Sequence, residues 1–79
     1  MIKYKIDTKS NIPILILERA KGAEETDTCP FCGTGHIHGT ADGHRLAHCG
    51  SNGNGIKDSI VADDGTVLEQ KYGYFIVTR

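Results

Sequence analysis

The cysteines and histidines of this chain are concentrated in one short segment. All three cysteines and all four histidines lie between Cys29 and Cys49. Thiolates and imidazoles are the ligands that suit Zn²⁺, and a closed structural zinc site needs four of them around the ion. The spacing Cys29-x2-Cys32 is typical of the first half of such a site. The segment therefore predicts a metal centre that constrains how the rest of the chain folds.

The size of the chain explains why a metal ion is needed. Its 79 residues include ten Gly and no Trp, and an apolar core at this length supplies only ~3–5 kcal/mol of stability. A structural Zn²⁺ contributes ~10–16 kcal/mol in small finger peptides. We therefore expect one structural zinc ion and a single domain over residues 1–79 that depends on it.

Alternation and turn residues predict a β-rich domain with little or no helix. Residues 2–6 alternate apolar and basic side chains, which is the period of a half-buried strand. Residues 12–17 form a continuous apolar run that favours a buried strand, although Asn11 and Pro13 are also compatible with the start of a short helix.

The C-terminal third contains a hairpin signal. Asp64-Gly65 separates two short apolar runs and is a preferred pair for a tight β-turn. Residues 72–78 are aromatic and β-branched, which favours a last strand. The expected fold class is a small all-β or α+β metal-stabilised domain. A zinc module with a ribbon-like hairpin, residues 29–50, is inserted between N-terminal strands 1–21 and a C-terminal hairpin 56–79.

The metal ligands are predicted from residue type and spacing. Cys49 is expected to bind with Cys29 and Cys32, and Gly33 suits the position after the second cysteine, which commonly needs a positive φ. For the fourth ligand we favour His44, because His44-x4-Cys49 matches the second half of a retroviral-type zinc knuckle. His48 and His36 are the alternatives, and His38 is the least favoured.

Two arguments speak against catalysis. The Cys-Pro-Phe-Cys pair also occurs in glutaredoxin-type dithiols, but those need a helix after the first cysteine, and residues 33–39 are poor helix formers. A catalytic zinc needs an open coordination position and a general base, and the chain has no His-Glu-x-x-His or His-x-Glu pattern. We expect no enzymatic activity and assign no catalytic residue.

Three stretches of the sequence carry a family resemblance. Residues 29–39 read Cys-Pro-x-Cys-Gly-x-x-His-x-His-Gly, residues 43–49 read Gly-His-Arg-x-Ala-His-Cys, and residues 73–76 read Gly-Tyr-Phe-Ile. This pattern resembles small zinc-ribbon proteins encoded by bacteria and their phages, largely of unassigned function. The resemblance implies a metal-stabilised β fold, a phage or prophage origin, and a strand position for Tyr74 near the ribbon.

Charge and targeting signals narrow the expected function. The net charge is −1, so no global field attracts nucleic acid or membrane. The N-terminus lacks a signal-peptide pattern and the cysteine number is odd, which predicts a cytoplasmic protein, in the bacterial host if phage-encoded.

We expect a protein-interaction module, as a phage-encoded modulator or inhibitor of a host system, with Arg45 and His38 as candidate partner-binding residues. The alternative is a nucleic-acid-binding zinc ribbon, and no small-molecule substrate is evident.

Overall fold

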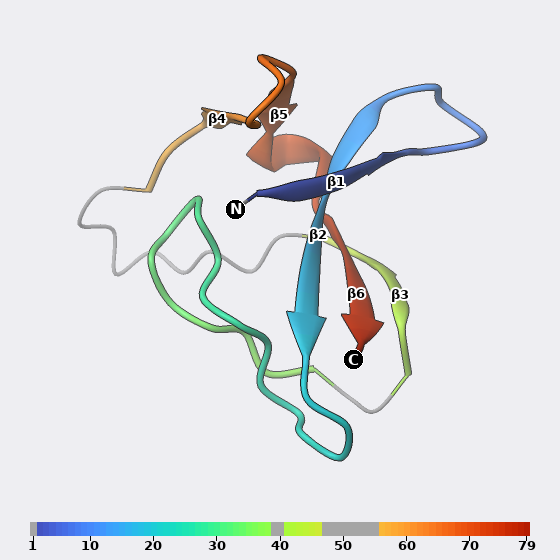
Figure 1. Ribbon diagram of the computed structural model, residues 1–79, viewed down its shortest axis with the longest axis vertical. Coiled ribbons are helices and arrows are strands. Elements are labelled where there is room, and N and C mark those ends of the chain that lie inside the picture. Colours follow the sequence, from blue (N-terminus) through green and yellow to red (C-terminus); the bar gives the residue numbers. More distant parts are fainter. Residues whose placement is uncertain (1, 39–40, 47–55) are drawn as a thin grey trace.

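The computed structural model describes residues 2–38, 41–46 and 56–79, and these form two β-sheets (Figure 1). The larger sheet has the strand order β1-β2-β6-β3, and the smaller one is a β4–β5 hairpin. This small, β-rich architecture with almost no helix confirms the coarse fold class. The elements are β1 (Lys3–Ile6), β2 (Pro13–Arg19), β3 (Gly43–Arg45), β4 (Ser59–Val61), β5 (Val67–Glu69), the 3₁₀ turn η1 (Gln70–Tyr72) and β6 (Tyr74–Thr78).

The first two strands form an antiparallel hairpin. The connecting turn is closed by Asp7, whose carboxylate accepts hydrogen bonds from the Ser10 backbone N–H at 2.9 Å and the Ser10 hydroxyl at 2.7 Å. These bonds to Ser10 lower the pKa of Asp7. The continuous apolar run predicted over residues 12–17 enters β2 at Pro13, and the strand continues to Arg19. The run is therefore a strand and not the start of a helix.

The centre of the larger sheet pairs strands that are distant in sequence. β6 lies parallel to β2, with Ile16 opposite Phe75, and antiparallel to β3, with His44 opposite Phe75. In Figure 1 the C-terminal strand lies between β2 and β3. β3, which comes from within the predicted zinc module, is therefore joined to the same sheet as the N-terminal strands.

The two faces of this sheet have different compositions because side chains alternate along each strand. One face carries Leu15, Leu17, Tyr74 and Ile76, all almost fully buried. The core on this face also takes in side chains from the cysteine loop and from the β4–β5 hairpin, namely Cys29, Phe31, Ile60, Ala62 and Leu68. The opposite face, which we call the outer face, carries Lys3, Lys5, Ile16, Phe75 and His44 by register.

The predicted hairpin turn is present between β4 and β5. Gly65 has φ +89° and its N–H donates to Ala62 O at 2.9 Å, which closes the turn. Tyr4 connects this turn to the larger sheet by donating its hydroxyl to Asp64 Oδ2 at 2.5 Å. This bond from Tyr4 is the main cause that lowers the pKa of Asp64.

A buried arginine fixes the segment that leads into β3. Arg19 is 1% exposed, and its Nη2 donates to Asp42 Oδ1 at 3.0 Å. Asp42 also accepts hydrogen bonds from the backbone N–H and the hydroxyl of Thr78. The bonds from Thr78 and then the Arg19 guanidinium lower the pKa of Asp42.

Among the described residues, no helix has the length and apolar character needed to cross a membrane.

Candidate metal centre

The loop between β2 and β3 folds into a tight knuckle around its first cysteine. The Cys29 N–H donates to Thr34 O at 2.8 Å, and the Gly33 N–H donates back to Cys29 O at 2.7 Å. Gly33 has φ +80°, a conformation that glycine adopts without steric cost. This confirms the conformation predicted for the residue after the second cysteine and brings Cys32 beside Cys29.

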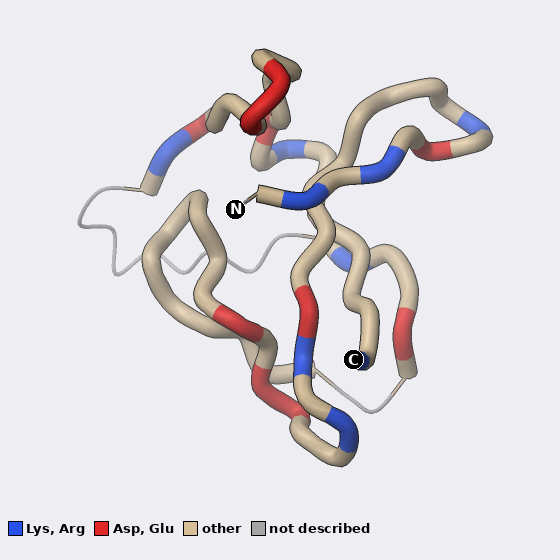
Figure 2. The backbone as a smooth tube through the Cα atoms, viewed as in Figure 1, with Lys and Arg blue, Asp and Glu red and all other residues tan. Residues whose placement is uncertain are grey.

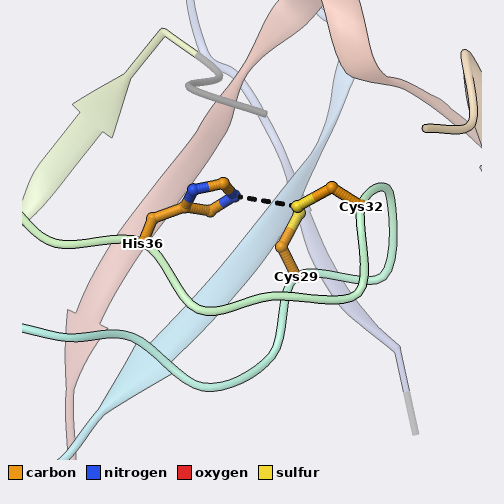
Figure 3. Close-up of side chains that lie close together, drawn as sticks. All are labelled: Cys29, Cys32 and His36. Carbon is orange, nitrogen blue, oxygen red and sulfur yellow. Dashed lines mark hydrogen bonds between the residues drawn. The ribbon is translucent and has the colours of Figure 1, made fainter. Parts of the chain in front are cut away.

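Three side chains of this loop form a group with the geometry of a metal site (Figure 3). The ligand atoms of Cys29, Cys32 and His36 all lie within 4.8 Å of one another. Cys32 Sγ and His36 Nε2 are 3.5 Å apart. Tetrahedral Zn²⁺, with its usual Zn–S and Zn–N lengths, requires a sulfur-to-nitrogen separation of about 3.6 Å. The two thiols and the imidazole therefore fit a zinc ion both in donor type and in spacing.

Backbone and ring contacts hold the His36 imidazole in position. The His36 N–H donates to Thr26 Oγ1 at 3.0 Å, and the Thr26 N–H donates to His36 O at 2.8 Å. The ring stacks on Tyr74 with centroids 5.2 Å apart and an interplanar angle of 12°. Because Tyr74 is fully buried in the sheet core, the imidazole is anchored to β6 as well as to its own loop.

Further polar contacts surround the group. The Tyr74 hydroxyl and His38 Nε2 are 2.6 Å apart, and Thr34 Oγ1 lies 3.3 Å from Cys32 Sγ. A hydroxyl at this distance donates a hydrogen bond to a thiolate when a metal is bound. Such outer contacts orient ligands and tune metal affinity.

A close backbone approach also fixes the loop. A Cβ at Gly35 would lie 2.6 Å from Thr26 O, so only glycine fits between the cysteine knuckle and the preceding segment. The close approach at Gly35 lets the chain pair with the preceding segment at the Glu25–Ile37 bridge. His36, next to this bridge, thereby lies beside the two cysteines.

Only some of the predicted metal ligands lie close together in the described part of the chain. Cys29 and Cys32 lie together with His36, which was an alternative ligand. The favoured His44 is not in this group: it lies exposed on β3, with Nε2 2.7 Å from Tyr72 O and its ring 5.2 Å from that of Phe75. Cys49 and His48 lie outside the described residues.

The two candidate partner-binding residues have local contacts. The Arg45 guanidinium donates to His44 O at 3.0 Å and to Ala41 O at 2.8 Å. His38 is half-buried and contacts Tyr74 as described above. His38 therefore supports the metal loop, whatever else it binds.

Residues that support the site include some that sequence reasoning did not single out. Thr26 and Thr34 belong to this set. Tyr74 was expected on a strand near the metal module, but its stacking on His36 was not predicted. A threonine two residues after a Cys-x2-Cys pair is the one local signal for such a contact, since its hydroxyl reaches the second sulfur.

Comparison with protein-family models, curated proteins and solved structures finds no match to this chain.

Proposed function

We propose that this protein is a protein-interaction module folded around one structural zinc ion. The observation that carries this proposal is the burial of two of the three donors: Cys29 is 0% and His36 6% exposed, while Cys32 is half-buried. A catalytic zinc keeps one position open to substrate, whereas a structural zinc is enclosed by protein ligands. Burial of this kind supports the structural role.

The proposed ligands are Cys29, Cys32 and His36, with Cys49 as the fourth ligand from the sequence. Elemental analysis of purified protein tests this set, with one zinc per chain as the expected result. Cys49→Ser should lower the zinc affinity, and Ser10→Ala, in the β1–β2 turn and outside the described donor group, is the matched control. Full zinc affinity in Cys49→Ser would exclude Cys49 as a ligand.

The interaction role is supported by apolar side chains on the surface. Leu46 is 71% exposed and lines one surface groove together with Ile12, Ile14 and Tyr72, and contiguous exposed apolar surface is typical of binding sites. Capture with immobilised zinc-loaded protein from a bacterial lysate should recover a stoichiometric partner, and the chelated protein should not recover it. Failure to recover any partner across lysates would contradict the proposal.

Nucleic-acid binding is the second candidate, because Lys3 and Lys5 share the outer face with His44. Binding of this kind weakens steeply with salt. An oligonucleotide titration at low and moderate salt tests it, and an absence of binding at low salt would exclude it.

A further inference from the structure

A groove of about 470 Å³ lies where the β1–β2 turn, the end of β3 and η1 meet. Its apolar lining, which we call the floor, consists of Ile12, Ile14, Leu46 and Tyr72. We call it the hairpin groove. Its volume falls in the range of sites that enclose a ligand or one or two anchoring side chains.

The rim of the hairpin groove is basic. Lys9 and Lys71 line it beside His44, and β1 carries two further basic residues, Lys3 and Lys5 (Figure 2). Asp7 is the one carboxylate in the described lining, and its hydrogen bonds from Ser10 lower its pKa and keep it ionised. The two lysines against this one carboxylate leave the described lining with a net positive charge. Lys71 also lies 3.7 Å from Glu69, but both side chains are exposed, and such a pair is worth little. The charge of the rim therefore complements an anionic ligand.

The aromatic rings near the groove are arranged unfavourably for nucleic acid. Lys71 Nζ lies 5.1 Å from the centre of the Tyr72 ring, and Lys5 Nζ lies 4.5 Å from that of Phe75. Single-stranded nucleic acid binds by stacking bases on open aromatic faces. A base stacking on these faces would have to displace a lysine ammonium, so the apolar lining of the groove is the more available contact surface.

We propose that the hairpin groove binds an acidic peptide segment of a partner protein, with an apolar side chain inserted on the floor and carboxylates at the basic rim. This inference rests on the proposed interaction function and names its recognition site. Leu46 is the central contact, because it is apolar, 71% exposed and part of the groove lining.

A titration with defined peptides tests the proposal. Zinc-loaded, ¹⁵N-labelled protein is titrated with the peptide Glu-Glu-Leu-Phe-Glu-Glu, with a Ser-Ser version that lacks the apolar anchor, and with a short thymidine oligonucleotide. We expect saturable shifts at Ile14, Leu46 and Tyr72 with the first peptide and at least tenfold weaker binding of the Ser-Ser version. Absence of saturable shifts, equal binding of both peptides, or tighter binding of the oligonucleotide at these residues would each overturn the proposal.

Substitutions in the hairpin groove test whether the peptide binds there. Leu46→Asp and Lys71→Glu each change an exposed groove residue and should weaken the peptide at least tenfold. Val61→Asp is the matched control, since Val61 is also exposed but lies on β4 outside the groove lining. A dispersed spectrum confirms that each variant is folded. Equal peptide binding by all folded variants would overturn the proposal.

The outcome for the groove is separable from the outcome for the proposed function. If a captured partner binds Leu46→Asp and Lys71→Glu as tightly as the unchanged protein, the groove is excluded but the interaction function stands. If no partner is captured, the interaction function fails, whatever the peptide titration shows.

Discussion

The four-stranded sheet and the metal loop, residues 24–38, are ordered by different forces. In the sheet, ladders of backbone hydrogen bonds join β1, β2, β6 and β3, and apolar side chains fill one face. The metal loop has a single strand-like bridge, Glu25 to Ile37, and its ordering depends on the knuckle and the group of three ligands. Yet the loop contributes Cys29 and Phe31 to the sheet core. Because the loop shares these side chains with the core, we expect the metal loop and the sheet to unfold together.

The strongest test of this unity is removal of the metal. Chelation with excess EDTA, or Cys29→Ser, should unfold the whole domain, because a structural zinc contributes ~10–16 kcal/mol and the core alone ~3–5 kcal/mol. We expect loss of dispersed amide NMR signals in β1, β2 and β6 as well as in the loop. Readdition of zinc to the chelated protein is the control and should restore them. Signals of the sheet that stay dispersed after proven metal loss would show that the two regions are independent.

The next largest effect concerns the histidine ligand. His36→Ala should lower zinc affinity by more than the ~10–100-fold that contacts around a ligand give, because it removes a donor. His44→Ala is the matched control and should change stability by less than about 0.5 kcal/mol, as is usual for an exposed side chain. Competition with a zinc chelator of known affinity measures both. A large loss of affinity in His44→Ala with none in His36→Ala would restore the assignment made from spacing.

The alternation of β-strands explains why spacing alone favoured another histidine. The knuckle-like pattern has four residues between His44 and Cys49, but β3 pairs with β6 so that His44 lies opposite Phe75 on the outer face. Tyr74, one residue earlier, points to the core and stacks on His36. The register of β3 against β6 therefore keeps His44 away from the two cysteines, and spacing along the chain does not reveal that register. His36, the proposed ligand, lies in the same eight-residue segment as Cys29 and Cys32, so the local pattern could name it only as an alternative.

Local patterns predicted the strands whose pairing is local. The alternation of residues 2–6 and the Asp64-Gly65 turn both correspond to observed hairpins. The parallel pairing of β2 with β6 and the three-residue β3 were not predicted. Both depend on tertiary contacts: Arg19 holds Asp42 in front of β3, and Gly73 allows β3 to approach β6.

Gly73 provides a test confined to the sheet. A Cβ at this position would lie 2.1 Å from Arg45 O, and the residue has φ +76°. Gly73→Ala should therefore cost about 2–4 kcal/mol by combining overpacking with backbone strain.

The matched control for this substitution is Gly65→Ala, where φ is +89° but nothing lies within 4 Å of an added Cβ. It should cost only about 1 kcal/mol, from strain alone. Urea unfolding of both zinc-loaded variants measures the free energies. Equal losses would mean that the close approach of Arg45 to Gly73 adds no cost beyond backbone strain and that β3 can move away without loss.

The smallest expected effect is at the contact between the two regions. Tyr74→Phe removes the hydroxyl that lies 2.6 Å from His38 Nε2 but keeps the ring stacked on His36. The loss of one buried hydrogen bond should cost about 1–2 kcal/mol, and zinc affinity should hardly change because the stack remains. Tyr4→Phe is the matched control, because its hydrogen bond to Asp64 is exposed and water can replace it, so that its cost should be smaller. A loss of zinc affinity in Tyr74→Phe as large as that expected for His36→Ala would show that the hydroxyl and His38, rather than the stacked ring, hold the imidazole on the metal.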